Sequence, residues 1–586
     1  MTSHRGPVAL WVVFTLLLGA VALSIDVPRT TYGIKSDEAT YVGAALSLAY
    51  DGDLRYERVD LERFEALYHS GPEGIFLKRA KGDHLYFAKA FLYPALAAPF
   101  VRAFGLNGLL LLHALLLAAA GLCAYRFLAA QMTPVAAAVM TTAFFGASVL
   151  PIYGVFLMPE VLNLALVVGA YFFWLYKEVK PGSRLASPWT DLVAAALLGI
   201  GTYSKPAPIP LLVAPLVLLP WIRRQWRWGF VVGATSVACA ALLFTINVGV
   251  TGEFNYQGGD RKTFYARFPL DAPGATWEAR GGAVVTDAST TQDALGSELP
   301  TRFVRNAKYF LVGRHFGFVP YFFPAVLALL AWLLSPARRD PWRLLTFGAI
   351  MVSAVTLLLW LPWTWSGGGG PPGNRYYSSV YPLFLFLIPP GAGVGVGVVA
   401  WVIGALFTAK MVANPFVAAK YTYLMMETGP ARWLPVELTM ANDLPIRLDP
   451  SRGYVHYGPY DDRGMILYFL DQNASPPEPE GMWVSGTGRT DVLVRTTKPV
   501  HHLAVEAQSP IRTVLTVSAG GAAVTVHLEP GAPRTVDVPV EGVSGRRDFA
   551  FLLSARSSEG FVPHATNPDS PDFRNLGAQL RFSLVR

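Results

Sequence analysis

Long runs of apolar residues recur along the first 411 residues of the chain, separated by short polar connectors. A membrane-spanning helix needs about 18 to 20 mostly apolar residues, and a soluble core does not need so many runs of that length. The pattern predicts eleven spans, at residues 8–25, 107–128, 134–150, 159–176, 190–204, 207–221, 229–249, 319–335, 343–361, 378–390 and 393–411. It therefore predicts a multi-pass α-helical membrane protein.

Basic residues gather in three of the connectors, at 176–180, at 223–227 and at Arg338-Arg339. Cytoplasmic loops of membrane proteins carry an excess of Lys and Arg, and a cytoplasmic N-terminus places all three connectors on that side. Residues 1–24 could instead be a cleaved signal peptide. Their apolar core of about 18 residues is longer than the usual 7 to 15, so a retained helix is favoured, and every later loop keeps its side in either case.

This topology leaves four substantial pieces outside, at 26–106, 250–318, 362–377 and beyond 412, and chemistry is expected there. The first piece contains an apolar stretch, 87–104, that is interrupted by Lys89, Pro94, Pro99 and Arg102. Such a pattern is typical of a helix that lies in the membrane interface. We refer to residues 87–104 as the interfacial stretch.

After Met482 the period changes to short alternating runs divided by Gly and Pro turns, for example 513–517 and 523–528. These are strand signals, and five or more of them in about a hundred residues predict an antiparallel β-sandwich. The sequence thus predicts three regions, a transmembrane domain at 1–411, an extracytoplasmic connector at 412–480 and a sandwich at 481–586. The Pro-rich segment 476–479 is the expected linker.

Composition supports this interpretation, because 53% of the residues are hydrophobic and only 15% are charged, against roughly 25% charged in a soluble domain. The net charge of +8 comes mainly from the connectors. No basic stripe with interleaved aromatics and no phosphate-binding glycine loop is present, so no nucleic-acid partner is expected. The two cysteines, Cys123 and Cys239, lie in apolar segments and can form neither a disulfide framework nor a zinc site.

An acidic pair, Asp37-Glu38, follows the first span by about a dozen residues and leads into a helical stretch through Tyr50. Ser36 or Asp37 could simply cap that helix, with Glu38 interacting with the helix dipole. Alternatively, a carboxylate near the membrane surface could deprotonate an acceptor hydroxyl while an anomeric carbon is attacked. We predict Asp37 as the catalytic base, with Glu38 as a second catalytic candidate.

Four basic or titratable side chains are candidates for binding the phosphate of a lipid-linked donor, which needs fixed cations near the membrane. Lys89 lies in the interfacial stretch, where snorkelling to the headgroups is the simpler interpretation. Lys205 ends a span and could be an ordinary interfacial anchor. Arg375 follows a glycine-rich turn, and its guanidinium can bind a phosphate through two hydrogen bonds. His84 could bind phosphate or assist the base, although a surface histidine needs no such role.

Three further residues are predicted to contact substrate. Glu160 begins a span at the outer face, where it either stabilises the helix start or joins the polar site. Tyr93 belongs to the interfacial stretch, and Tyr376 follows Arg375 in a loop whose aromatics either stack on sugars or form an interfacial belt. The outward carboxylates would suit Mg²⁺, Mn²⁺ or Ca²⁺, but no Asp-x-Asp or His-rich cluster reinforces that idea. No metal site and no required cofactor are predicted, and a divalent cation remains an alternative.

Residues 1–411 resemble the membrane-embedded glycosyltransferase C superfamily, particularly the branch of bacterial aminoarabinose transferases and protein O-mannosyltransferases. The resemblance is carried by Lys35-Ser36-Asp37-Glu38, the 89–94 stretch, Met158-Pro159-Glu160, Tyr203-Ser204-Lys205-Pro206 and Gly373-Asn374-Arg375-Tyr376.

This resemblance implies a polyprenyl-phosphate sugar donor, inversion at the anomeric carbon, Asp37 as base, and Lys89 and Arg375 as contacts to the lipid phosphate. It also implies a bacterial cell-membrane enzyme of envelope glycan biosynthesis. The C-terminal region looks like the jelly-roll or carbohydrate-binding domains attached to some of these enzymes.

The main hypothesis is therefore an inverting glycosyltransferase that moves a hexosyl or pentosyl group from a polyprenyl-phosphate donor to a hydroxyl of an exported glycan, lipid or protein. One rival is a transporter or lipid flippase, for which ionisable residues near the bilayer midplane and two related halves are expected. The other is a non-catalytic, membrane-anchored glycan-binding protein.

Overall fold

The computed structural model divides the 586-residue chain into two compact units. The first unit comprises Met1–Gln292, Phe318–Leu361 and Pro371–Lys420, and the second comprises Asp293–Gly317, Pro362–Gly370 and Tyr421–Arg586. The structure describes residues 5–31, 33–256, 261–271, 274–279, 281–283, 298–440, 443–444, 454–457, 465–475, 478, 481–545 and 548–585.

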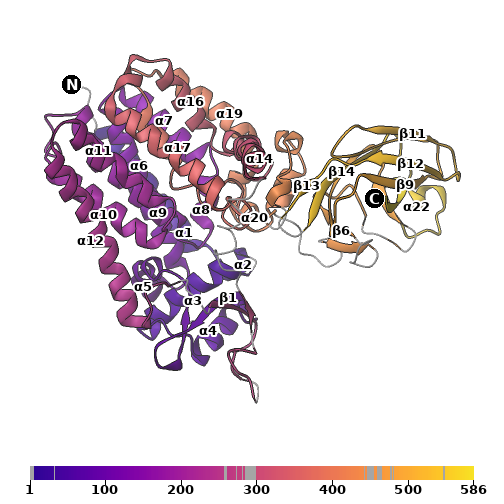
Figure 1. Ribbon diagram of the computed structural model, residues 1–586, viewed down its shortest axis with the longest axis horizontal. Helices are drawn as coiled ribbons and strands as arrows, with labels where there is room; N and C mark the ends of the chain where they lie inside the picture. The colour runs from indigo at the N-terminus through magenta and orange to yellow at the C-terminus, as the bar shows by residue number, and fades with distance from the viewer. Residues whose placement is uncertain are drawn as a thin grey trace. The chain divides into compact units, whose positions relative to one another are not determined.

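The first unit is mainly helical (Figure 1). Its longer helices are α1 (Arg5–Ser24), α3 (Ser36–Tyr50), α4 (Arg58–Tyr68), α5 (Leu92–Phe104), α6 (Asn107–Ala129), α7 (Pro134–Gly146), α9 (Glu160–Val179), α10 (Trp189–Ser204), α11 (Ala214–Ile222), α12 (Trp226–Thr251), α16 (Phe323–Leu333), α17 (Pro341–Trp360) and α19 (Val394–Ala413). The shorter ones are α2 (Val27–Thr30), α8 (Leu150–Val155), α15 (Phe318–Tyr321), α18 (Leu383–Leu387) and α20 (Pro415–Lys420), with 3₁₀ turns η1 (Lys81–Asp83), η2 (Ile209–Val213) and η3 (Pro336–Arg339).

Five helices of the described chain, α6, α9, α12, α17 and α19, are long and apolar enough to cross a membrane. The prediction of a mainly helical integral membrane protein is thus confirmed. The helices pack as neighbours, with α10 in contact with both α9 and α12. A Cβ atom at Gly199 of α10 would lie 2.3 Å from the carbonyl oxygen of Ser236 in α12. Glycine is therefore needed there for the close approach of the two backbones.

The range 378–390 differs from the predicted span. It contains only the five-residue helix α18, whose side chains are buried. Pro382 cannot donate a backbone hydrogen bond, and Pro389-Pro390 disfavours helical backbone at the residue before it. Proline at both ends therefore limits the helix to a single turn inside the unit.

A small antiparallel sheet joins the two loops that were predicted as separate outside pieces. Its strand order is β2-β1-β3-β4, formed by β1 (Glu73–Arg79), β2 (Leu85–Phe87), β3 (Arg261–Tyr265) and β4 (Gly282–Ala283). Lys78 of β1 is 1% exposed, and its ammonium lies 3.1 Å from a carboxylate oxygen of Glu253, just after α12. This pair helps to fix the sheet against the end of a span.

The interfacial stretch was predicted to be a helix over residues 87–104, but its first residues are not helical. Phe87 pairs with Leu77 in the sheet, and the amide of Ala88 donates to the carbonyl of Phe76 at 3.0 Å. Helix α5 begins only at Leu92. Lys89 therefore lies in a loop between β2 and α5, because strand pairing holds the backbone extended up to that point.

The second unit contains helix α14 (Leu299–Val312), the short helices α21 (Thr422–Met426) and α22 (Pro563–Thr566), the turns η4 (Pro430–Trp433) and η5 (Leu438–Met440), and two antiparallel sheets. One sheet has the order β11-β10-β14-β8-β6-β5, with β13 also paired to β14, and the other has the order β12-β9-β15-β7. The strands are β5 (Tyr454–Tyr457), β6 (Met465–Phe469), β7 (Met482–Ser485), β8 (Arg489–Thr496), β9 (His502–Gln508), β10 (Thr513–Ala519), β11 (Val524–Leu528), β12 (Arg534–Pro539), β13 (Val543–Ser544), β14 (Phe549–Ser557) and β15 (Leu576–Val585).

The predicted strand-rich C-terminal region is confirmed. Side chains of both sheets, such as Val505 and Phe551, belong to one hydrophobic cluster. Strands β5 and β6 fall in the range predicted as a connector, and β6 pairs with β8. The domain boundary at 481 stays a prediction, and the predicted linker at 476–479 lies outside the described residues except for Glu478.

Phe551→Ala should destabilise the second unit, because Phe551 is fully buried in the cluster shared by the two sheets. Truncation of a buried Phe typically costs about 3 to 5 kcal/mol of unfolding free energy. Phe573→Ala is the matched control, since Phe573 is 69% exposed. Hydrogen exchange in β8 and β14 of the full chain measures both changes. Equal protection in the Phe551 and Phe573 variants would contradict the assigned core.

Candidate functional site

Helix α3 presents the acidic pair at its first turn. Its N-cap is Lys35, which makes no side-chain capping hydrogen bond, so neither Ser36 nor Asp37 caps this helix. Ser36 has φ of 51°, a left-handed conformation that costs free energy for a residue other than glycine. The hydroxyl of Thr40 accepts from the amide of Phe76 at 2.9 Å, which ties the helix start to β1. Asp37 therefore lies at a helix start that has a strained backbone and is hydrogen-bonded to β1.

Asp37 lies between two cations. One carboxylate oxygen is 2.5 Å from Nζ of Lys89, and the other is 3.1 Å from Nη2 of Arg375. The side chains of Lys89 and Arg375 are only 9% exposed, and that of Asp37 is 19% exposed. Burial raises the pKa of Asp37, but the two cations outweigh it and hold the pKa well below its usual range. Asp37 is therefore ionised and fully paired.

A second carboxylate extends the cluster. Glu160, the first residue of α9, is 4% exposed, and its Oε1 lies 3.4 Å from Nζ of Lys205 and 3.6 Å from Nε of Arg375. Lys205 also lies over the ring of Tyr376 at 4.8 Å and donates to the carbonyl of Arg375 at 3.4 Å. The predicted residues Asp37, Lys89, Glu160, Lys205, Arg375 and Tyr376 thus form one continuous cluster. Segments far apart in the sequence meet in it.

The turn before Arg375 is shaped by Gly373. Its φ is 80°, and a Cβ atom there would lie 2.9 Å from the side chain of Val149. The hydroxyl of Tyr153 donates to the carbonyls of Pro372 and Gly373, at 3.2 and 3.3 Å. Glycine is required for both the conformation and the space. This turn positions the guanidinium of Arg375.

Arg261 is a cation that the sequence analysis missed. It begins β3, and its guanidinium lies 5.2 Å from the centre of the Phe76 ring, while Nζ of Lys89 lies 4.8 Å from the same ring. Burial lowers the pKa of Lys89, and the charge of Arg261 lowers it further. A basic residue in the second outside loop was the available signal. Only the pairing of β3 with β1 reveals its proximity to the site.

The cluster carries a positive excess. Four cations, Lys89, Lys205, Arg261 and Arg375, accompany the two carboxylates of Asp37 and Glu160, which leaves two positive charges. Oε2 of Glu160 accepts no hydrogen bond from the described residues. Such an excess favours an anion such as a phosphate.

Glu38 has different partners from those of Asp37. It is 2% exposed, its Oε1 accepts a hydrogen bond from the amide of Leu157 at 3.0 Å, and its Oε2 pairs with Lys420 of α20. Leu157 directly precedes the Met158-Pro159-Glu160 turn. Through the hydrogen bond from Leu157, Glu38 therefore holds in place the segment that carries Glu160. The basic residue Lys420 was also missed from the sequence.

Two other predicted residues lie apart from the ion cluster. Tyr93 is fully buried in α5, where its hydroxyl hydrogen-bonds Nε2 of His113 at 2.8 Å and its ring packs edge-on against Tyr41. His84 is exposed at the turn between β1 and β2. No interaction of the described residues joins the His84 side chain to Asp37. The roles predicted for Tyr93 and His84 stay predictions.

Within the described ranges, no group of three or more His, Cys, Asp or Glu side chains is arranged to hold a metal ion. Asp37 and Glu160 are engaged by cationic side chains instead. A divalent cation stays an alternative prediction.

Lys420→Met should destabilise the first unit, because it leaves the buried carboxylate of Glu38 without its cation. Breaking a buried pair by removing one partner typically costs about 3 to 5 kcal/mol. Glu38→Gln combined with Lys420→Met should recover part of this loss, since the amide oxygen still accepts from Leu157. Thermal unfolding of the two single variants and the double variant measures the coupling. Strictly additive losses would contradict the assigned pair.

Of the comparisons with known proteins, the one with solved structures gives a match. No protein-family model matches the chain, and no curated protein matches it. Among solved structures, the chain is similar to ArnT from Cupriavidus metallidurans, whose crystal structure has undecaprenyl phosphate bound. The identity is 14%, the match covers 71% of this chain and 78% of that chain, and the TM-score is 0.31.

Proposed function

We propose that this protein is an inverting glycosyltransferase that moves a sugar from a polyprenyl-phosphate donor to a hydroxyl acceptor at the extracytoplasmic face of the membrane. The observation that carries the proposal is the Asp37 carboxylate, 19% exposed, held between Lys89 and Arg375 inside a cluster with two excess positive charges. This combination supplies a base and an anion site side by side. Both are needed when a hydroxyl displaces a phosphate.

The donor phosphate would take the cationic side of the cluster. Arg375 can bind phosphate through two parallel hydrogen bonds, and Lys89, Lys205 and Arg261 add positive charge around it. These cations stabilise the negative charge that develops on the leaving phosphate oxygen. Because the cluster lies at the ends of α9 and α10, a lipid tail can remain in the bilayer while the phosphate is bound.

The activation of Asp37 as a base follows from competition between its carboxylate and the donor phosphate for Lys89 and Arg375. In the free protein, Lys89 and Arg375 hold the pKa of Asp37 low, which makes it a weak base. A bound phosphate draws both cations toward itself, and burial then raises the pKa of Asp37 toward a value useful for catalysis. Asp37 is thus activated when the donor is present.

The transfer itself is a single displacement. Asp37 accepts the proton of the acceptor hydroxyl while the acceptor oxygen forms a bond to the anomeric carbon. The bond from that carbon to the phosphate oxygen breaks, and the polyprenyl phosphate leaves with the electron pair. Attack opposite the leaving group inverts the configuration at the anomeric carbon.

The expected placement in a bacterial inner membrane is implied by the family resemblance, and the distribution of charge gives the expected orientation. With a cytoplasmic N-terminus, the basic connectors after α9, α11 and α16 lie in the cytoplasm and the Asp37 cluster lies outside. The C-terminal strands, as a β-sandwich, would then also lie outside, where a glycan, lipid or protein acceptor is found. Glu38 would support the site through Leu157 rather than take part in proton transfer.

Asp37→Asn should abolish transfer, because an amide cannot accept the proton of the acceptor hydroxyl. Loss of a general base typically lowers the rate roughly 100- to 10,000-fold. The assay is the release of free polyprenyl phosphate from a mixture of polyprenyl-phosphate sugars by the purified protein. Asp51→Asn is the matched control, since Asp51 lies at the other end of α3, where it pairs with Arg63.

Release of the carrier that is equal for Asp37→Asn and the unmodified protein would refute Asp37 as the base. Movement of intact donor across vesicles without release of carrier phosphate would favour the transporter alternative. Binding of glycans without either activity would favour the glycan-binding alternative.

The pH dependence should separate the free protein from the donor complex. The acid limb of kcat/KM for the donor reports the free protein, in which the pKa of Asp37 is well below its usual range. The acid limb of kcat reports the complex, in which the phosphate has drawn the cations away. We expect the acid limb of kcat to lie at a higher pH than the acid limb of kcat/KM. Two limbs at the same pH would contradict donor-dependent activation.

A further inference from the structure

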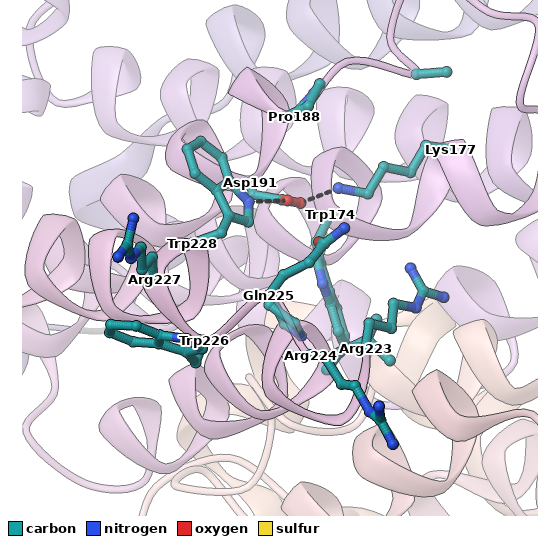
Figure 2. A pocket seen from close by; sticks show the side chains of 13 residues that line it. Trp174, Lys177, Pro188, Asp191, Arg223, Arg224, Gln225, Trp226, Arg227 and Trp228 are labelled. Atoms are coloured by element: carbon teal, nitrogen blue, oxygen red, sulfur yellow. Dashed lines mark hydrogen bonds and ion pairs between the residues drawn. The ribbon is translucent and has the colours of Figure 1, made fainter.

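A cavity lies at the ends of helices α9 and α10 that are farther from the Asp37 cluster. Its volume is about 680 Å³, and it is lined by the connector after α9, the start of α10 and the connector between α11 and α12. Figure 2 shows the charged and aromatic side chains that face this region, among them Lys177, Asp191, Arg224, Arg227 and Trp228. None of these residues takes part in the Asp37 cluster.

The cavity lies at a membrane face opposite to the Asp37 cluster. Lys177 follows Glu160 by 17 residues along α9, which corresponds to about 25 Å at 1.5 Å per residue. The hydrocarbon core of a bilayer is about 30 Å thick. Trp221 and Trp226, which are 50% and 62% exposed, flank the same connector. Exposed tryptophans at the end of a span are typical of the membrane–water interface.

Part of the charge in this cavity is already neutralised. Lys177 pairs with Asp191, whose second oxygen accepts from the indole of Trp228 at 2.9 Å. Arg223 makes a two-pronged pair with Glu178, at 2.7 and 2.8 Å. The lining cations Lys177 and Arg223 thus have carboxylate partners.

Two arginines remain uncompensated. Neither Arg224 nor Arg227 makes an ion pair with a carboxylate of the described residues, although Arg227 lies over the ring of Trp226 at 5.2 Å. The cavity therefore carries two excess positive charges. Positive connectors alone can set membrane topology, but they do not require a cavity of about 680 Å³.

The backbone at Arg224 is strained. Its φ is 62°, in the left-handed region, and the hydrogen bonds from Arg224 N to Trp221 O and from Gln225 N to Pro220 O close the turn. Such a conformation costs free energy for a residue other than glycine and is often found at binding sites. The turn places the two arginines on either side of Gln225 and Trp226.

We propose that this cavity binds the phosphate headgroup of an anionic phospholipid from the leaflet opposite the Asp37 cluster. A guanidinium group can bind two oxygens of one phosphate at once. Basic pockets between spans bind anionic lipid headgroups. The apolar wall at Leu219 and Pro220 and the exposed tryptophans place acyl chains in the bilayer beside the headgroup. This proposal does not depend on the proposed transferase activity.

Native mass spectrometry of the purified full chain with phosphatidylglycerol or phosphatidylcholine tests the site. The unmodified protein should retain phosphatidylglycerol in preference, and R224Q/R227Q should retain it at least tenfold less. R338Q/R339Q is the matched control, because Arg338 and Arg339 are exposed in another basic connector. The control should retain phosphatidylglycerol like the unmodified protein.

Three results would overturn the proposal. They are unchanged retention in R224Q/R227Q, equal loss in R338Q/R339Q, and displacement of the lipid by excess inorganic phosphate, which would indicate a soluble-anion site. If R224Q/R227Q does not fold, R224K/R227K provides the test. It keeps both charges but loses the paired hydrogen bonds, so an intermediate loss supports the headgroup site and full retention contradicts it.

Discussion

Removing a charged side chain from water costs several kcal/mol, and a buried ion cluster is tolerated only when every member has good partners. This constraint governs the first unit. Asp37, Lys89, Glu160, Lys205 and Arg375 are all largely buried, and each contributes to the pairing of another. The start of α3, the loop before α5, the ends of α9 and α10 and the turn at Gly373 must therefore converge. A displacement of any one segment leaves a buried charge unpaired.

The same constraint gives Asp37 a second role under the proposed function. Without Asp37, the four clustered cations would have only the carboxylate of Glu160 beside them and would repel one another in a region of low dielectric constant. The Asp37 carboxylate neutralises Lys89 and Arg375 until a phosphate binds beside it. It thus keeps the anion site folded before the donor arrives. The residue that stabilises the empty site is then the residue that becomes reactive when the site is filled.

Much of the cluster could be predicted from the sequence, since Asp37, Glu160, Lys205 and Arg375 each lie within a dozen or so residues of a predicted span end. The topology alone assigns such residues to one face of the membrane. Arg261 and Lys420 were missed because their positions depend on contacts across the chain. Arg261 reaches the site through the pairing of β3 with β1, and strand registers between distant segments leave no local signal.

The local sequence pattern also failed to predict the backbone conformation where strand pairing or a proline determines that conformation. Lys89 lies in a stretch whose composition favours a helix, yet the pairing of Phe87 with Leu77 keeps the preceding backbone extended. The predicted span at 378–390 has the right hydropathy, but Pro382 and Pro389 confine its helix to one turn. In both cases apolar composition indicated burial correctly, and the backbone conformation was decided by other interactions.

The acidic doublet at the start of α3 shows how neighbouring residues of one type acquire different roles. Successive side chains of an α-helix point about 100° apart, because the helix has 3.6 residues per turn. Asp37 and Glu38 therefore cannot face the same site. Asp37 faces Lys89 and Arg375, whereas Glu38 accepts from Leu157 and pairs with Lys420. Since Leu157 leads directly into Glu160, the second carboxylate acts on the ion cluster through the backbone that carries Glu160.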